Sequence, residues 1–247
     1  MDLLSLLGVI LAFVALLGGT LLEGGTLSSL INVPAAVIVM GGTIAAITLQ
    51  TPATVLKRAI RLLGWVLSPP RVSMEDGVGK VVNWSMQTRK KGILGLESAT
   101  ASETEPFAQK GLQMLVDGVE PDMIRTMLET DLESREQRDL DAARVYEAMG
   151  GYAPTIGIIG AVMGLIQVMS DLEDPASVGK GIATAFVATI YGIALANLLL
   201  FPVASKLRSI VRYRSRYQEM MIEGLLAVLE GENPRNIQFR LNGFMHH

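Results

Sequence analysis

Two long apolar runs without a single charged residue constrain this chain more than any other feature. They cover 152–169 and 182–204, and the short acidic stretch 171–175 separates them. At 1.5 Å per residue, a helix of either length crosses a hydrocarbon core of roughly 30 Å. Runs at 3–22 and 31–49 have the same character, and the first is expected to be a retained helix because no basic residue precedes it. The sequence predicts an all-α polytopic membrane protein with four transmembrane helices.

Composition excludes most enzyme and cofactor chemistry. Half of the 247 residues are hydrophobic, there is no cysteine, and the only histidines are His246 and His247. Disulfides, thiolate or histidine metal centres and a Ser-His-Asp triad are therefore not expected. No phosphate-binding GxxxxGK[ST] motif occurs, and a net charge of −3 argues against nucleic acid as a partner. We expect no enzymatic activity, no cofactor and no metal site.

The placement of basic residues orients the predicted helices. Of the 21 Lys and Arg residues, 13 lie between Lys57 and Arg144 and seven between Lys206 and Arg240, which leaves Lys180 alone in the short loops. Cytoplasmic loops carry the excess of Lys and Arg in membrane proteins. Both termini and the large central segment are therefore predicted to be cytoplasmic.

The chain then divides into four predicted parts. They are transmembrane helices one and two (1–50), a mostly helical cytoplasmic domain (51–147), transmembrane helices three and four (148–206), and a cytoplasmic C-terminal helix and tail (207–247).

Local signals place helices in the cytoplasmic parts. Pro69-Pro70 breaks an early stretch, and Pro121 is suited to the first turn of a later helix. That helix carries an amphipathic stripe, which consists of Ile124, Met127, Leu128 and Leu132. The polar stretch 133–144 can continue this helix into the third transmembrane helix. Residues 220–229 form another amphipathic helix, which 231–235 should end.

Small residues recur along one face of both later transmembrane helices. In the third they are Gly157, Gly160 and Gly164, and in the fourth Ala185, Ala188, Gly192 and Ala196, with Thr184 and Thr189 beside them. Small residues let two transmembrane backbones approach closely, and ordinary helix packing explains such stripes. The alternative is that these faces receive a helix from a partner protein.

The four apolar runs contain no Asp, Glu, Lys, Arg or His. An ion carrier normally needs an ionisable group within the membrane. Either this chain moves no ions, or the carboxylate comes from another polypeptide. Pro154 and Pro202 should lie at similar depth near the cytoplasmic face, where each removes a backbone donor. They can be hinges that pass motion to the cytoplasm, or kinks that packing accommodates.

Several short motifs together make the chain similar to the MotA/PomA family of flagellar stator proteins. These are 153–157 (APTIG), 189–192 (TIYG), Phe201-Pro202, Asp174-Pro175, 115–118 (LVDG) and 231–235 (GENPR). The resemblance covers nearly the whole chain. It implies a bacterial inner-membrane protein that forms a ring, a pentamer in this family, around a dimer of a MotB-type partner. That partner supplies the ion-binding Asp, and ion flow turns the ring against the rotor protein FliG.

The resemblance also assigns roles to individual residues. From their charges alone, Arg89, Lys90 and Glu97 would by default form a solvated charged face, whereas the resemblance matches Arg89, with Lys90 beside it, and Glu97 to the rotor-facing charged residues of the family. Pro154 and Pro202 match its two essential prolines.

The resemblance further implies that an ion path and the partner helix are lined by Gly157, Gly160, Ala161, Gly164, Ala185, Thr189 and Gly192. Thr189 matches a threonine on this path, and Ala161 stands where sodium-driven relatives have a second one. Thr155 lies six residues before Ala161, nearly two turns away, and cannot replace that hydroxyl. One hydroxyl is a poor cage for sodium and sufficient for a water-assisted proton path, so the predicted ion is the proton.

Other functions are less consistent with the sequence. An ExbB/TolQ-type energiser of outer-membrane transport is the main alternative, but such proteins typically have three transmembrane helices. A transporter acting alone is disfavoured by the charge-free runs, and no nucleophile–base pair suggests an enzyme.

Overall fold

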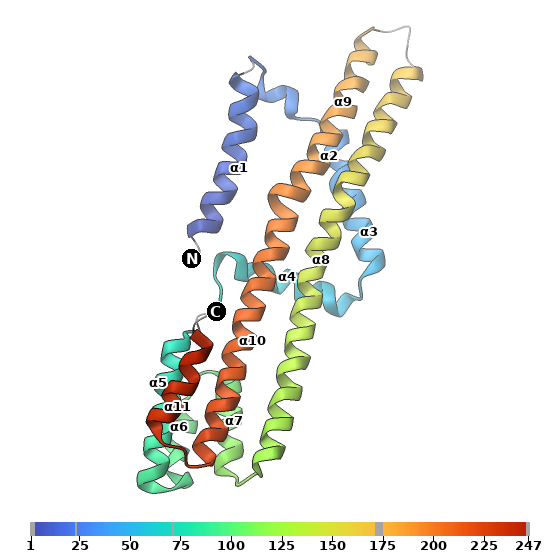
Figure 1. The fold of residues 1–247 in the computed structure, drawn as a ribbon. Helices are drawn as coiled ribbons and strands as arrows, with labels where there is room; N and C mark the ends of the chain where they lie inside the picture. Colours follow the sequence, from blue (N-terminus) through green and yellow to red (C-terminus); the bar gives the residue numbers. More distant parts are fainter. Residues whose placement is uncertain (1–2, 23, 71, 171–174, 246–247) are drawn as a thin grey trace. The chain divides into compact units, whose positions relative to one another are not determined.

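The computed structural model describes residues 3–22, 24–70, 72–170 and 175–245, and across these ranges the chain is helical without a strand (Figure 1). Two compact units are present. The first unit comprises residues 1–69 and 139–209, and the second comprises 70–138 and 210–247. The predicted acidic turn at 171–174 and both histidines lie outside the described residues.

Three stretches are long and apolar enough to cross a membrane. One is Val33–Gln50, and the others lie within Pro121–Ser170 and Pro175–Leu229. The first predicted run forms helix α1 (Leu3–Leu22), in which the apolar stretch Leu7–Leu22 is shorter, so its crossing stays a prediction. The all-helical, apolar character expected from the sequence is confirmed.

The first unit begins with α1. It shares two long helices, α8 and α10, with the second unit, because the boundaries at 138/139 and 209/210 fall inside them. Its elements are η1 (Leu27–Leu30), α2 (Val33–Ala36), η2 (Val37–Gly41), α3 (Gly42–Gln50), α4 (Ala53–Leu67), α8 (Pro121–Ser170), α9 (Pro175–Ala194), η4 (Leu195–Leu200) and α10 (Phe201–Leu229). Segments η2 and η4 are π-helical, which the sequence analysis did not predict. A π-turn shifts the hydrogen-bond register by one residue and is often found at functional positions.

The predicted helix boundaries agree with the structure at several prolines. Helix α4 ends at Leu67, just before Pro69-Pro70, and α8 begins at Pro121. Helix α8 then continues for 50 residues to Ser170, so the amphipathic stripe and the third apolar run belong to one helix, as expected. Helix α10 ends at Leu229, and the Asn233 side chain caps a further short helix that starts at Pro234.

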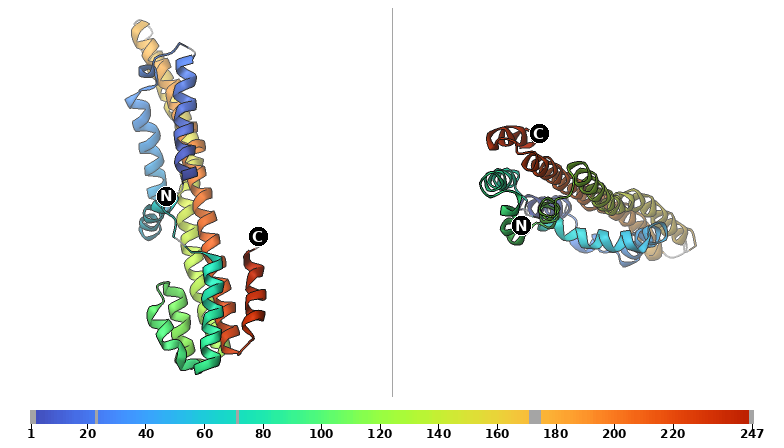
Figure 2. Two further views of the ribbon diagram at one scale, coloured as in Figure 1. Left: turned by 90° about the vertical axis from the view of Figure 1, so that its left-hand side faces the viewer. Right: turned by 90° about the horizontal axis from the view of Figure 1, so that it is seen from below.

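The second unit packs short helices around the ends of α8 and α10. They are α5 (Met74–Lys91), η3 (Ile93–Leu96), α6 (Glu97–Ser102), α7 (Pro106–Val116), α11 (Pro234–Asn242) and η5 (Gly243–Met245). Helices α5 and α11 lie side by side (Figure 2). The core consists of large apolar side chains, among them the fully buried Phe107, Leu112, Leu128, Met220 and Leu225. Burial of these apolar side chains holds the helices of the unit together.

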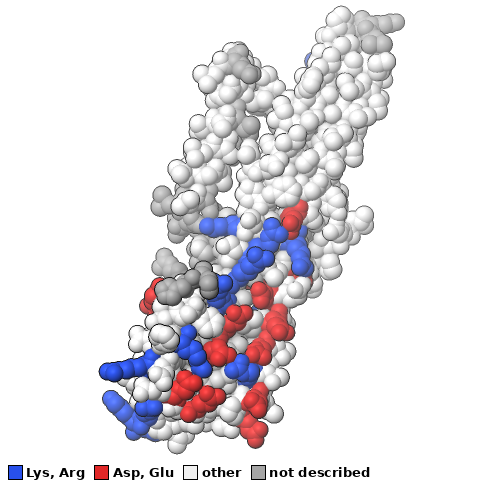
Figure 3. Space-filling view, viewed as in Figure 1, with Lys and Arg blue, Asp and Glu red and all other residues white. Residues whose placement is uncertain are grey.

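Charged side chains are distributed unevenly over the chain. Lys, Arg, Asp and Glu crowd over the helices of the second unit and the adjoining stretches of α8 and α10, while α1 and α9 are almost bare (Figure 3). Large apolar residues on α8 and α9 are instead exposed, including Ile159, Ile166, Phe186 and Ile193. Such exposed apolar surface suits a lipid environment or contact with other membrane helices.

Candidate functional site

The small-residue faces of α8 and α9 lie against each other. A Cβ built on Gly157 would lie 2.8 Å from the carbonyl oxygen of Ala188, and one on Gly164 would lie 2.8 Å from that of Gly181. Gly160 is equally tight against the Ala188 side chain, at 2.9 Å. The two helices therefore meet backbone to backbone. Packing accounts for the glycines, and their predicted place along a partner helix stays a prediction.

Two of the predicted ion-path residues directly follow residues of this contact in the chain, Ala161 after Gly160 and Thr189 after Ala188. Ala161 and Thr189 are both half-buried. The Thr189 hydroxyl donates to the Ala185 carbonyl oxygen of its own helix at 3.1 Å. Its oxygen lone pairs remain able to accept a further hydrogen bond. Thr189 can therefore serve as an acceptor on a water path, whereas Ala161 offers no oxygen from its side chain.

The two prolines lie close to this helix contact. Pro154 is inside α8, and a Cβ on Gly192 of α9 would lie 3.1 Å from its Cα and 2.5 Å from the Ala153 carbonyl oxygen. One turn earlier, Gly150 packs against the ring of Phe201, the residue that precedes Pro202. Pro154 therefore lies at the α8–α9 contact, and the residue beside Pro202 packs on α8, while the similar depth and hinge role of the two prolines stay predictions.

A polar cluster joins the start of α2 to α9, and the sequence analysis missed it. Asn32 Nδ2 donates to the Thr184 hydroxyl at 2.8 Å, and the Asn32 backbone N–H donates to the Tyr191 hydroxyl at 3.3 Å. The Tyr191 hydroxyl in turn donates to the Leu30 carbonyl oxygen. Thr184 and Tyr191 are seven residues apart, which is two turns of α9 and places both on one face. The cluster fixes the α1–α2 connection to α9.

A partly buried ion pair joins α4 to α8 within the first unit. Arg58 binds Asp139 through two hydrogen bonds, Nε–Oδ1 at 2.7 Å and Nη2–Oδ2 at 2.9 Å. The Asp139 side chain is only 6% exposed, and the guanidinium also lies over the Trp65 ring at 5.6 Å. Bidentate arginine–carboxylate pairs are directional, so this contact fixes the register of α4 on α8.

The predicted rotor-facing residues lie at the tip of α5 and the start of α6. Arg89, Lys90 and Glu97 are all exposed. Arg89 and Lys90 belong to the last turn of α5, where positive charge complements the helix dipole. Arg89 Nη2 donates to the Gly231 carbonyl oxygen at 3.0 Å, in the turn between α10 and α11. The motif 231–235 thus supports the arginine.

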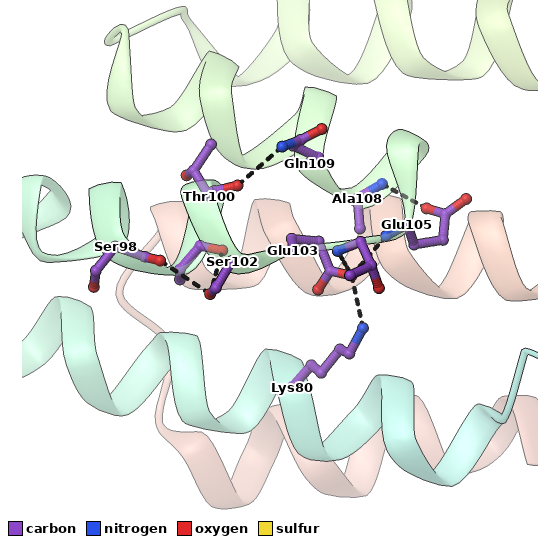
Figure 4. Close-up of polar contacts among 10 residues, drawn as sticks. Lys80, Ser98, Thr100, Ser102, Glu103, Glu105, Ala108 and Gln109 are labelled. Carbon is purple, nitrogen blue, oxygen red and sulfur yellow. Dashed lines mark hydrogen bonds and ion pairs between the residues drawn. The ribbon is translucent and has the colours of Figure 1, made fainter.

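The segment that carries Glu97 is held to α5 by a charged contact (Figure 4). Lys80 Nζ of α5 donates to Glu103 Oε1 at 2.7 Å. The same oxygen accepts the backbone N–H groups of Thr104 and Glu105 at 2.9 Å each, and the Glu105 carboxylate caps α7 through Ala108. Since the Glu103 side chain is only 4% exposed, this contact fixes the α6–α7 connection on α5.

Two carboxyl groups of the second unit have shifted pKa values. Burial raises the pKa of Glu219, and the neighbouring carboxylate of Glu136 adds to the effect. Burial also acts to raise the pKa of Asp131, but hydrogen bonds from Arg135 and Lys110 together hold that pKa below its usual value. Across the part of the chain that the structure describes, no three His, Asp or Glu residues are grouped to hold a metal ion.

The fold and these contacts define a class of protein. It is an all-helical protein with helices apolar and long enough to cross a membrane, whose apolar runs lack an ionisable group of their own, and it carries a charged helical unit. A model of the MotA/TolQ/ExbB proton channel family matches residues 99–220, and a model of the motility protein A N-terminal region matches residues 6–81. The second match favours the motility branch over the ExbB/TolQ branch.

Relatives and solved structures agree over the full length. Motility protein A of Bacillus subtilis is 36% identical, with 98% of this chain and 90% of the relative covered. Chemotaxis protein PomA of Vibrio alginolyticus is 32% identical, with coverages of 100% and 96%. The structure of C. jejuni MotAB matches with a TM-score of 0.95 at 30% identity, covering 100% of this chain and 97% of that chain. The flagellar MotAB stator complex from Bacillus subtilis matches with a TM-score of 0.87 at 36% identity, covering 95% and 92%.

The chain belongs to the motility protein A (MotA/PomA) family. It is a flagellar motor stator subunit and an inner-membrane protein.

Proposed function

We propose that this chain forms the ring of a flagellar stator that couples inward proton flow to torque on the rotor protein FliG. Its partner is a MotB-type protein with one transmembrane helix, which supplies the ion-binding Asp, and the ring is a pentamer. One observation carries the proposal. The chain matches the MotAB complexes over its full length, yet its own apolar runs contain no ionisable residue, so the ion-binding group has to come from a second protein.

The proposed topology has four transmembrane helices and cytoplasmic termini. The support is the excess of Lys and Arg in the central and C-terminal segments, together with the three stretches that are long and apolar enough to cross a membrane. Helix α1 is the remaining transmembrane helix. The second unit and α4 are then cytoplasmic.

The proton is the proposed ion because the side chains near the α8–α9 contact offer few oxygen ligands. A sodium ion must exchange its water for oxygen ligands, whereas a proton needs only a carboxylate and a hydrogen-bonded path. Thr189 supplies one hydroxyl at this contact, and Ala161 supplies none. The carboxylate of the partner and water complete the proton path.

The ion is tested by swimming speed in a strain whose only stator contains this chain. Swimming should continue without sodium and stop when a protonophore collapses the proton gradient. Rotation that stops on sodium removal but survives the protonophore would overturn the proton assignment. Ala161→Thr is the informative variant, because it adds the hydroxyl that sodium-driven relatives have. If the proton assignment is correct, the Ala161→Thr stator should still rotate without sodium. A new sodium requirement in this variant would show that the side chain at this position selects the ion.

The proposed rotor contact uses Arg89, Lys90 and Glu97, and the proposed hinges are Pro154 and Pro202. Exposed ion pairs contribute only about 0–1 kcal/mol each, so neutralising one charge should weaken motility and reversing it should weaken motility further. Stator recruitment to motors, counted by fluorescence, measures this. Wild-type recruitment and swimming of Arg89→Glu would place the rotor contact elsewhere.

A further inference from the structure

We propose that Leu94 is the apolar anchor of the rotor contact. Its partner is a helix of the rotor protein that presents an apolar side chain between an acidic and a basic residue. This inference rests on the proposed function, and it adds the residue that gives the contact its affinity. The charged residues around it then provide orientation and steering.

Leu94 is exposed in a turn whose next leucine is buried. Its side chain is 69% exposed, whereas Leu96, two residues later, is fully buried in the core of the second unit. Gly92 ends α5 with φ +72°, a conformation that side chains other than glycine rarely adopt. The turn therefore directs one leucine outward and the next one inward.

Several contacts hold this turn in place. Gly95 lies so close to α5 that a Cβ there would be 2.8 Å from the Cβ of Lys91. The Gly95 N–H donates to the Gly92 carbonyl oxygen at 3.0 Å, and the Thr100 hydroxyl donates to the Leu96 carbonyl oxygen at 2.9 Å. A backbone that is already ordered loses little conformational entropy when a partner binds. The backbone that carries Leu94 is thus in place before the rotor arrives.

Charges of opposite sign lie on the two sides of Leu94 in the chain. Arg89, Lys90 and Lys91 precede it at the end of α5, and Glu97 follows it at the start of α6. Within the described ranges, Lys90, Lys91 and Glu97 are exposed, and their side chains have no hydrogen-bond or ion-pair partner. This arrangement is complementary to a helix with acidic and basic residues on either side of an apolar one.

Leu94 and the charged residues are expected to contribute differently to rotor binding, because protein interfaces obtain most of their affinity from apolar contacts. Exposed charge pairs contribute little to affinity and mainly guide association and exclude wrong partners. Most of the binding energy at interfaces comes from a few well-packed side chains that become fully desolvated. At this tip, Leu94 is the exposed large apolar side chain between the charged residues.

A single exposed leucine is ordinary on a protein surface, so its context has to distinguish it. Met127 of α8 is the useful comparison in the same unit. It is also exposed, at 46%, but it lies on a regular helix far along the chain from the positive cluster. Met127 is therefore a matched control for loss of exposed apolar surface.

The test measures binding of the purified stator complex to the purified rotor protein for Leu94→Ser, Leu94→Met and Met127→Ser. Leu94→Ser should weaken binding roughly tenfold, because the apolar leucine atoms beyond Cβ no longer become buried against the rotor. Leu94→Met should restore most of the affinity, and Met127→Ser should bind like the wild type. In cells without another stator, Leu94→Ser should reduce the number of stators at each motor.

Salt distinguishes the anchor from the charges. Raising the ionic strength screens exposed charges, so the defect of Arg89→Glu should shrink while the defect of Leu94→Ser persists. If Arg89→Glu loses binding and Leu94→Ser does not, the anchor is wrong and the proposed rotor contact stands. If both variants bind like the wild type, the rotor contact is elsewhere and both proposals fail. An equal loss of rotor binding in Leu94→Ser and Met127→Ser would also overturn the proposal that Leu94 is the anchor.

Discussion

The α8–α9 contact and the core of the second unit are both helix packings, but the first uses small residues and the second uses large apolar side chains. Between α8 and α9, glycines and alanines let backbones touch, with Gly157, Gly164 and Gly192 each facing a carbonyl oxygen of the other helix. The second unit instead buries large side chains such as Phe107 and Leu225. In water, burial of apolar surface drives packing, whereas lipid is as apolar as leucine and gives helices no such reason to associate. Between α8 and α9, the close approach of the two backbones takes the place of apolar burial as the source of helix association.

The largest effect is expected from filling the backbone contact. In Gly192→Val, the new Cβ would lie 2.5 Å from the Ala153 carbonyl oxygen, so α9 would have to move away from α8. We expect a cost of about 3 kcal/mol or more and loss of the complex with the partner. Co-purification of the tagged partner from membranes measures this. Gly179→Val on the same helix is the control, because a Cβ there meets nothing within 4 Å. Normal co-purification of Gly192→Val would show that the close approach is dispensable.

A smaller effect is expected where a glycine faces a side chain. In Gly111→Ala, the new Cβ would lie 2.3 Å from Leu225 Cδ1, the end of a side chain that can rotate. The cost should be about 1–3 kcal/mol, with assembly retained. Hydrogen exchange of α7 and α10 in the purified complex measures this loss of stability in the second unit. Gly192→Ala adds the same methyl group at the backbone contact and serves as the comparison. If Gly111→Ala disturbs its unit as much as Gly192→Ala disturbs the α8–α9 contact, the distinction between backbone and side-chain contacts is wrong.

Pro202→Ala should change motion more than assembly. The substitution restores a backbone donor at the start of α10 and should stiffen the helix there. We expect normal co-purification with the partner and reduced torque, measured as the speed of tethered cells. Ser205→Ala, at an exposed position three residues later, controls for substitution in this turn. Full torque from a normally assembled Pro202→Ala complex would count against a hinge.

The smallest effect is expected from a surface charge of the second unit. The pKa of Asp131 is lowered in the folded protein, so its charged form contributes stability above the unfolded pKa of about 4. That contribution is lost as pH falls through the folded pKa. Asp131→Asn should cost about 0.5 kcal/mol at pH 7, and the difference from the wild type should disappear in acid. Hydrogen exchange of the first turns of α8 at both pH values tests this, with Glu133→Gln as control. A difference that persists in acid would exclude the carboxylate as its source.

Local patterns in the sequence predicted the helices well. Proline positions gave the end of α4 and the start of α8, and the spacing of small residues identified the faces by which α8 and α9 meet. These features depend on residues only a few positions apart. The chain is also a flagellar stator subunit, as the motifs implied.

Contacts between distant residues could not be read from such patterns. Arg58 and Asp139 are 81 residues apart, and Arg89 and Gly231 are 142 apart. Any Arg and Asp could pair as far as the sequence shows, and only the packing of α4 on α8 selects this pair. The π-helical segments were missed for a similar reason, since a one-residue shift in register depends on tertiary packing. The roles of Arg89, Lys90 and Glu97 remain predictions.

Pro154 has a consequence for the hydration of α8. Because proline has no N–H, the carbonyl oxygen of Gly150 lacks the donor that an α-helix would normally provide. Gly150 also has no side chain to shield this oxygen, and a Cβ built on it would lie 2.8 Å from the ring of Phe201. In an apolar environment, an unpaired carbonyl favours a water molecule or a hydroxyl donor beside it. A stretch of helix without any charged side chain therefore still offers one fixed dipole at which water can be ordered, and ordered water is what relays a proton.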